Sequence, residues 1–240
     1  MRARALTIGG AGAAVVVGAI TYGAGGLGFT AILLAFFVPS VLLSRLGRAR
    51  KRETLLDVDK QGARDAAQVL ANGGVATLCA LGFGLTGDHR LALAFVGAYA
   101  AATADTWATE VGTFAGGRPR SILTLRPLGT GLSGGVTLIG TLAEIAGAWW
   151  LGTIGALVLH VSLVTGALLG IAGFVGATVD SLVGATAQEL RRCSLCERAC
   201  ETNPHHCGSP TRRVRGLSGV TNDVVNALAT LAGALIAAAF

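Results

Sequence analysis

Residues 91–112 read LALAFVGAYAAATADTWATEVG, an apolar segment that ends with two carboxylates, Asp105 and Glu110. Residues 113–135 follow as TFAGGRPRSILTLRPLGTGLSGG, a loop rich in arginine and glycine. Acids within apolar sequence are costly to bury and usually mark a pathway or a reaction site. A loop of small residues with arginines beside them offers what a phosphate group needs. Together the two stretches predict a site for phosphate and metal at one face of a membrane.

The composition is that of a membrane protein. Of the 240 residues, 52% are hydrophobic and only 13% are charged, whereas a soluble domain has roughly a quarter of its residues charged. The 36 glycines, together with many alanines, favour helices that pack closely through small faces. The net charge of +6 does not indicate a nucleic-acid partner, because basic residues in a membrane protein first report orientation.

Seven apolar segments predict an all-α, polytopic helix bundle that forms one integral membrane domain, residues 1–240. The segments are near the roughly 20 residues that a bilayer requires, apart from one long span at 155–188. The first has a rival interpretation as a cleaved signal peptide, because its start is basic and its middle apolar. The fifth ends at Trp149 and Trp150, a pair typical of the membrane interface. The segments are about 5–22, 27–44, 64–85, 91–112, 133–150, 155–188 and 221–240.

The basic residues support this count. All but one of the 19 lie in the N-terminal tail or in the loops 45–64, 113–132 and 189–220, which seven segments place on one side. Only Arg90 falls on the other side. The positive-inside rule then predicts a cytoplasmic N-terminus and an external C-terminus. We expect a protein of the cell membrane whose active face is toward the cytoplasm.

This topology brings polar residues to one depth, near the cytoplasmic ends of several helices. Hard oxygen ligands beside arginines and a Gly-Ser loop suit Mg²⁺ and a phosphorylated substrate. The chain has no GxxxxGK[ST] motif, so this is not an ordinary P-loop. The polar residues are Arg64, Asp65, Gln68 and Asn72 on the third segment, Asp105, Thr109 and Glu110 on the fourth, Asp180 and Ser181 on the sixth, and Asn222, Asp223 and Asn226 on the seventh.

Several of these residues also have a purely structural interpretation. Asp105 and Asp180 lie too far inside their helices to act as caps, and a salt bridge to Arg64 or Arg126 is the alternative for them. Glu144 is deeper and isolated, which favours a hydrogen bond to a neighbouring helix. Three residues stand where a helix cap is favoured, namely Asp65, Asn222 and Asp223.

The polar loop at 190–220 gathers thiols and imidazoles within fifteen residues. Cysteine and histidine at such density are typical of a structural zinc site, although the spacing is not that of a standard ribbon. A cytoplasmic location argues against disulfides. Cys79, alone in an apolar helix, is interpreted as a packing residue. The cluster comprises Cys193, Cys196, Cys200, His205, His206 and Cys207, and the predicted zinc ligands are Cys193, Cys196, His205 and Cys207.

Six blocks of the chain resemble the domain-of-unknown-function-92 family, also called the transmembrane protein 19 family. They are RDAAQVLANGG (64–74), ADTWATEVG (104–112), TLRPLGTGLSGGVTLIGTLA (124–143), ATVDSLVGATAQ (177–188), HHCG (205–208) and NDVVNAL (222–228). The resemblance spans almost the whole chain. That family includes the plant phytyl phosphate kinase of vitamin E synthesis, which makes phytyl diphosphate from phytyl phosphate and a nucleoside triphosphate. Many prokaryotic members have no assigned activity.

Residues and resemblance together predict an integral-membrane kinase for a prenyl-type lipid monophosphate, such as phytyl or polyprenyl phosphate, with a nucleoside triphosphate as donor. No general base is needed, because the attacking phosphate is already anionic. The predicted catalytic residues are Asp105, Glu110 and Asp180, and the predicted Mg²⁺ ligands are Asp105, Asp180 and Asp223. The predicted phosphate- and substrate-binding residues are Arg64, Asp65, Gln68, Asn72, Arg126, Gly129, Thr130, Gly131, Ser133, Gly134, Gly135, Ser181, Asn222 and Asn226.

Two other classes of function compete with the kinase. A transporter or flippase for a small anion or lipid phosphate also uses acids in helices, but should place them at the midplane of the membrane. The acids here are predicted near the cytoplasmic end. A non-catalytic scaffold leaves the positions of Asp105 and Asp180 unexplained.

Overall fold

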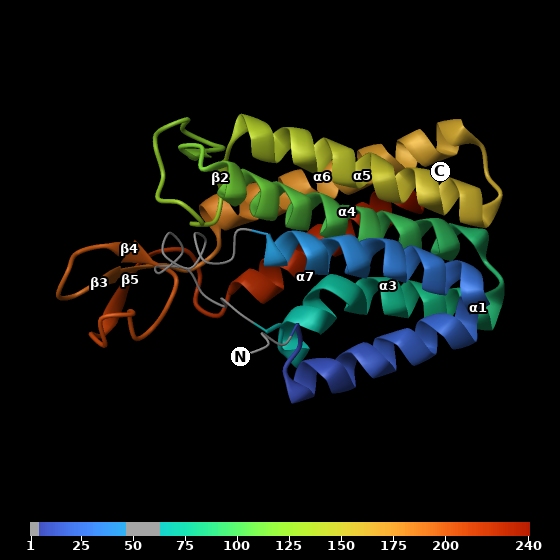
Figure 1. The fold of residues 1–240 in the computed structure, drawn as a ribbon, viewed down its shortest axis with the longest axis horizontal. Helices are drawn as coiled ribbons and strands as arrows, with labels where there is room; N and C mark the ends of the chain where they lie inside the picture. Colours follow the sequence, from blue (N-terminus) through green and yellow to red (C-terminus); the bar gives the residue numbers. More distant parts are fainter. Residues whose placement is uncertain (1–4, 47–62) are drawn as a thin grey trace.

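The computed structural model describes residues 5–46 and 63–240, which form a helix bundle with a small lobe of strands at one end (Figure 1). The predicted helical membrane fold is confirmed. The helices are α1 (Ile8–Arg45), α3 (Ala66–Thr86), α4 (His89–Ala115), α5 (Leu138–Leu159), α6 (Leu163–Thr186) and α7 (Asn222–Ala237).

Helix α1 is broken at Gly26, whose φ of 59° and ψ of −147° are open essentially only to glycine. The two halves of α1 lie antiparallel in Figure 1. The second half packs on α4, where Phe29 stacks on Phe95 with ring centroids 4.4 Å apart and Phe36 on Tyr99 at 5.2 Å. The halves correspond to the first two predicted segments.

Within the described residues, four helices are long and apolar enough to cross a membrane: α1, α3, α5 and α6. Helix α7 is apolar but has only 16 residues. Helix α4, which carries Asp105 and Glu110, is not among the four. The seven-span topology and its orientation therefore stay predictions.

The predicted single span 155–188 is wrong, because a turn divides it. The side chain of Ser162 accepts a hydrogen bond from the Thr165 N–H at 3.0 Å and caps the start of α6. His160, with a φ of 55°, ends α5. The turn contains no glycine or proline and has apolar residues on both sides, so hydropathy alone could not locate it.

The tryptophan pair also lies elsewhere than predicted. Because α5 runs on to Leu159, Trp149 and Trp150 lie in the middle of the helix rather than at its end. The indole Nε1 of Trp150 donates to the carbonyl of Ala35 in α1 at 3.0 Å. This tryptophan joins two helices instead of marking a membrane interface.

Helix α4 is the centre of the bundle. It contacts α1, α3, α5, α6 and α7, and its residues from Ala94 to Ala104 are all buried. Small residues permit these approaches. A Cβ at Gly97 would collide with Gly233 of α7, and one at Gly173 would collide with Ala100 of α4. The close packing through small faces that the composition indicates is thus found around α4.

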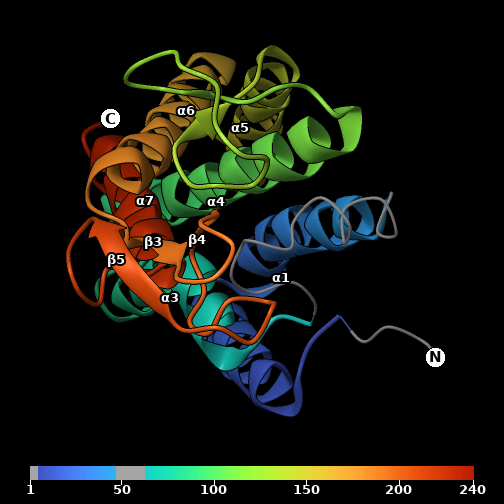
Figure 2. The same cartoon turned by 90° about the vertical axis from the view of Figure 1, so that its left-hand side faces the viewer.

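The loops contain short strands that the all-α prediction did not include. Between α4 and α5, β1 (Arg120–Ser121) pairs antiparallel with β2 (Gly135–Val136). Between α6 and α7, residues 190–220, here called the Cys/His module, form an antiparallel sheet of order β4-β3-β5. Its strands are β3 (Leu190–Cys193), β4 (Ala199–Cys200) and β5 (Thr211–Arg215). Figure 2 shows this module beside the loop between α4 and α5.

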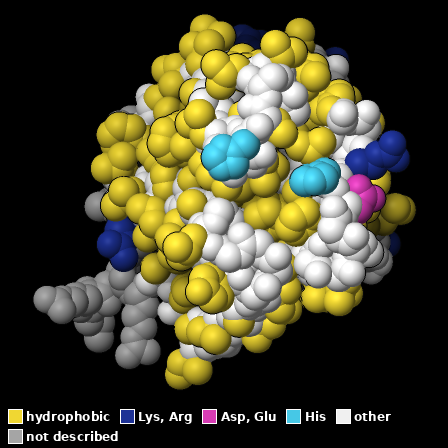
Figure 3. Space-filling view, turned by 90° about the vertical axis from the view of Figure 1, so that its right-hand side faces the viewer, with side chains coloured by type: hydrophobic (Ala, Val, Ile, Leu, Met, Phe, Trp, Pro, Cys, Tyr) yellow, Lys and Arg dark blue, Asp and Glu magenta, His cyan; other side chains and the backbone are white. Residues whose placement is uncertain are grey.

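These two loop regions lie at the same end of the bundle as the start of α1 (Figure 1). The face at the opposite end is mostly hydrophobic or uncharged and shows few charged side chains (Figure 3). This arrangement agrees with the predicted clustering of basic residues on one side. The basic residues at positions 2, 4 and 48–60 are outside the described residues.

Candidate functional site

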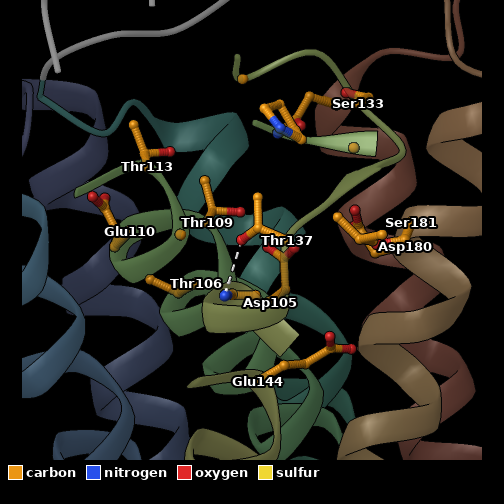
Figure 4. A pocket seen from close by; sticks show the side chains of 18 of the residues that line it. Asp105, Thr106, Thr109, Glu110, Thr113, Ser133, Thr137, Glu144, Asp180 and Ser181 are labelled. Atoms are coloured by element: carbon orange, nitrogen blue, oxygen red, sulfur yellow. Dashed lines mark hydrogen bonds between the residues drawn. The ribbon is translucent and has the colours of Figure 1, made fainter. Parts of the chain in front are cut away.

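A cavity of about 360 Å³ lies at the loop end of the bundle, lined by all six helices and by the loop between α4 and α5. Figure 4 shows side chains from α4, α5 and α6 around it. It brings together most of the predicted site residues, from segments far apart in the chain. Those lining it are Arg64, Gln68, Asn72, Asp105, Glu110, Thr130, Gly131, Ser133, Gly134, Gly135, Asp180, Ser181, Asn222 and Asn226.

Acids from three helices meet in this cavity. Asp105 comes from α4, Glu144 from α5 and Asp180 from α6 (Figure 4). Asp180 lies within electrostatic range of both others. One carboxylate oxygen of Glu144 and one of Asp180 are buried without a hydrogen-bond partner among the described residues. Buried carboxylates without partners are costly, so this arrangement favours a bound cation or a proton.

Glu144 is not isolated, although the hydrogen bond that was expected to a neighbouring helix is present, with the side chain of Thr178 in α6. It lines the cavity and lies within electrostatic range of Asp105. Its side chain is 6% exposed. Its position in the second turn of α5 did not indicate that it lies near the other acids, because only the packing of α5 against α4 and α6 brings it to them.

Two arginines of the described residues line the same cavity, Arg45 at the end of α1 and Arg64 just before α3. Burial lowers the pKa of Arg64, whereas the charges of Glu110 and Asp105 act to raise it. Its guanidinium stays protonated, as arginine does in proteins. Among the described residues, the lining has four carboxylates, the three above and Glu110, and two guanidiniums, which gives this part of the lining two formal negative charges. A divalent cation would balance them.

Sequence reasoning missed Arg45 and several hydroxyl groups. Thr106 and Thr113 lie on the cavity side of α4 beside Thr109, and Thr137 and Thr141 belong to the start of α5. The spacing of 106, 109 and 113 by three and four residues on one helix face could have indicated the first two. Thr137 also caps α5, because its Oγ1 accepts the Gly140 N–H at 3.0 Å, the dashed line in Figure 4.

Four predicted site residues do not line the cavity: Asp65, Arg126, Gly129 and Asp223. Asp65 is the N-cap of α3, and its Oδ1 accepts the Gln68 N–H at 2.9 Å, which is the capping alternative considered above. Arg126 is exposed outside the cavity. Asp223 lies in the first turn of α7, whose N-cap is Thr221. A role for Asp223 as Mg²⁺ ligand and for Arg126 as phosphate ligand therefore loses its geometric support.

The glycine-rich loop, residues 129–135, is held in place by hydrogen bonds and by packing. The Ser133 N–H donates to Oε1 of Glu201 at 2.7 Å, and the Gly135 N–H donates to the Leu132 carbonyl at 3.2 Å. Gly134 has a φ of 80°, and a Cβ there would lie 2.5 Å from the Cβ of Ala185 on α6. The loop thus packs on α6, and two of its predicted phosphate-binding N–H groups are already engaged.

The four predicted zinc ligands, Cys193, Cys196, His205 and Cys207, gather in the Cys/His module with their ligand atoms all within 4.8 Å of one another. The Sγ atoms of Cys193 and Cys207 are 3.6 Å apart. Nδ1 of His205 lies 3.5 Å from Sγ of Cys196 and 3.1 Å from Sγ of Cys207. Hydrogen bonds, chiefly the one with His205, lower the pKa of Cys207 to about 6, which favours the thiolate. These four side chains could hold a metal ion.

Cys200 and His206 are outside this group of ligands. Cys200 is fully buried in β4, and its Sγ lies 3.8 Å from the carbonyl of Thr202. The ring of His206 instead packs near that of His205, with centroids 4.0 Å apart.

Comparison with known proteins places the chain among integral membrane proteins. The family described as integral membrane protein DUF92 matches residues 1–234. The chain is 31% identical to Protein PGR of Arabidopsis thaliana over 223 residues, which cover 81% of this chain and 74% of that protein. An uncharacterized membrane protein of Methanocaldococcus jannaschii is 33% identical over 196 residues, covering 81% and 76%.

A more distant relative is Protein VTE6, chloroplastic, of Arabidopsis thaliana. It is 21% identical over 238 residues, which cover 97% of this chain and 64% of that protein. No solved structure matches.

Proposed function

This chain belongs to the integral membrane protein family DUF92, and from that premise we propose that it is a kinase that converts a prenyl-type lipid monophosphate to the diphosphate. The observation that carries the proposal is the meeting of buried acids, arginines and a glycine-rich loop in one cavity at the end of a membrane bundle. The resemblance of the sequence blocks to a family that includes a phytyl phosphate kinase supports the choice of substrate.

In this proposal Asp105, Glu144 and Asp180 hold Mg²⁺, with Glu144 in place of Asp223. The unpartnered oxygens of Glu144 and Asp180 and the two excess negative charges of the described part of the lining fit a hard divalent cation. When bound, Mg²⁺ would neutralise negative charge on the phosphate groups. Glu110, at the cavity wall near Arg64, helps to orient that guanidinium.

The substrates are held by the cationic and polar side of the cavity. Arg45 and Arg64 pair with phosphate oxygens, and the amides of Gln68, Asn72 and Asn222 donate hydrogen bonds to them. An oxygen of the lipid monophosphate attacks the γ-phosphorus of the nucleoside triphosphate. The new P–O–P bond forms as the bond to the β-phosphate oxygen breaks, and the nucleoside diphosphate leaves. The protein needs only to position the two anions and stabilise their charge.

The prenyl chain of the substrate lies in the membrane, among helices rich in alanine and glycine. We place the cavity on the cytoplasmic side of the cell membrane, where nucleoside triphosphates are available and where the basic loops are predicted to lie. This orientation also puts the Cys/His module in a reducing compartment.

For the Cys/His module we propose a structural zinc ion. Three thiolates and one imidazole nitrogen are the ligand set of Cys₃His sites, which are closed and tetrahedral. The 3.6 Å separation of two Sγ atoms suits sulfurs bound at about 2.3 Å to one Zn²⁺.

The kinase is tested with the purified chain in lipid nanodiscs. Phytyl, farnesyl and geranylgeranyl monophosphates are each incubated with ATP, GTP, CTP or UTP and Mg²⁺, and the lipids are analysed by mass spectrometry. We expect the diphosphate of at least one lipid, and its loss with EDTA and in the Asp180→Asn variant. If the folded protein makes no diphosphate in any combination, the kinase proposal is wrong. Movement of the unchanged monophosphate across vesicles would then favour the flippase.

A further inference from the structure

A carboxylate of the Cys/His module contacts the glycine-rich loop. Oε1 of Glu201 accepts the N–H of Ser133 at 2.7 Å, although the two residues are 68 positions apart. Glu201 directly follows strand β4, whose Cys200 pairs with Arg191 of β3. Strand β3 ends at Cys193, one of the four clustered ligands. The carboxylate that holds the loop is therefore attached to the scaffold that a metal would close.

A second contact joins the module to the end of α6, on which the same loop packs. Nη2 of Arg215, at the end of β5, donates to the Gly184 carbonyl at 3.1 Å. Gly184 and Ala185 are the residues of α6 on which the loop rests, since a Cβ at Gly184 would lie 3.1 Å from both the Gly134 nitrogen and the Ser133 Cβ. The module, the loop and the end of α6 that follows Asp180 are thus packed as one unit.

The module is too small to keep this shape through its own core. It spans residues 190–220, and its strands have four, two and five residues. Units below about 40 residues generally need a metal, disulfides or a partner to fold. The cysteines of the module are free thiols. Closure of the four ligands around a metal is therefore the means of fixing β4, and with it Glu201.

We infer that Glu201 is a positioning residue: it holds Ser133 and the glycine-rich loop at the cavity, and does so only while the Cys/His module is closed around its metal. Metal binding outside the membrane is thereby coupled to the geometry of the cavity. The role of the loop in binding phosphate rests on the proposed function. The hydrogen bond between Glu201 and Ser133, here called the tether, does not.

The tether is tested by hydrogen exchange of the full-length protein in nanodiscs, followed at the Ser133 amide by mass spectrometry. In Glu201→Ala this amide should exchange about tenfold faster or more, because a charge-assisted hydrogen bond is lost. Glu201→Gln keeps an acceptor oxygen and should restore most of the protection. Glu197→Ala is the matched control, because Glu197 lies in the same module but pairs with Arg192 at the surface. Cys196→Ser, which removes one metal ligand, should speed exchange as Glu201→Ala does.

Unchanged exchange at Ser133 in Glu201→Ala, or in metal-depleted Cys196→Ser, overturns the inference whatever the activity. A second readout is the affinity for geranylgeranyl monophosphate, measured by calorimetry, which should fall in Glu201→Ala. Tighter binding in that variant would show that the carboxylate occupies the place of a phosphate oxygen, and would also overturn the inference. If the wild type makes no diphosphate, the proposed function fails, and the exchange result alone decides the tether.

Discussion

The backbone N–H of Thr7 donates to the carbonyl oxygen of Arg64 at 3.0 Å, and the Arg64 N–H donates to the carbonyl of Ala5 at 3.0 Å. These two bonds fix the residue that supplies a guanidinium to the cavity wall. They also tie the start of α1 to the start of α3. The close approach requires Gly10, because a Cβ at that position would collide with the Arg64 carbonyl.

Gly10→Ala should therefore destabilise the protein and displace Arg64. Overpacking of this kind costs about 1–3 kcal/mol, which should lower the melting temperature by several degrees. Gly12→Ala is the matched control, since a Cβ at Gly12 meets nothing within 4 Å and alanine favours the helix. Thermal unfolding in detergent measures both. Equal melting temperatures for the two variants would contradict this packing.

The metal content should depend on four residues of the Cys/His module and not on their neighbours. Purified protein should contain close to one zinc per chain, as in other closed Cys/His sites. Cys196→Ser should lower that content, whereas Cys200→Ser and His206→Ala should retain it, because both residues are outside the ligand group. Elemental analysis after purification without chelators decides the question. Absence of zinc from the wild-type protein would show that the module is not a zinc site.

The two predicted phosphate-binding arginines should behave differently. Arg64→Gln should raise the KM for the lipid monophosphate, with a loss of about 1.5–3 kcal/mol expected for a charge-assisted bond. Arg126→Gln should leave KM unchanged, because Arg126 is exposed and outside the cavity. Steady-state kinetics with phytyl monophosphate compares them. An equal effect of both substitutions would mean that the loop moves to bring Arg126 to the substrate.

The sequence predicted that polar residues near the ends of several helices lie at one depth, and most of them line the cavity. Gln68 and Asn72 are four apart and do line the cavity together. Residues in loops were harder to place. Arg126 was predicted to face phosphate from its charge, but the turn between β1 and β2 carries it to the outside. The location of Glu144 in the cavity could not be predicted, because it depends on how α5 packs against α4. No local sequence pattern indicates which face of an apolar helix meets an acid.

The Cys/His ligands show the opposite case. Their chemistry limited the choice to few combinations, and the four predicted from the sequence are the four that gather. The three-stranded sheet around them could not be predicted, because strands of two to five residues leave almost no periodic pattern.

The orientation in the membrane is tested by reporter fusions. A reporter after Phe240 should be extracytoplasmic, and one in the Cys/His module should be cytoplasmic, because the basic loops are expected to stay inside. Alkaline phosphatase and a fluorescent protein, each active on one side only, provide the readout. The same side for both positions would exclude the seven-span topology.

Substitution of the cavity acids separates a reaction site from a structural ion pair. Asp105→Asn and Asp180→Asn are nearly isosteric, so they keep the packing and remove one negative charge each. If the acids hold Mg²⁺, both variants should stay folded and lose activity by about a hundredfold or more, since each lost ligand costs several kcal/mol of transition-state stabilisation. If the acids only balance Arg64, the variants should instead be unstable, because a buried arginine loses its partner.

Asp88→Asn, at the other end of α4, is the control, because asparagine also caps helices well. Melting temperature and kinase turnover are measured on the same preparations. A stable and inactive Asp105→Asn supports the site, and unstable protein with normal turnover in its folded fraction rules it out.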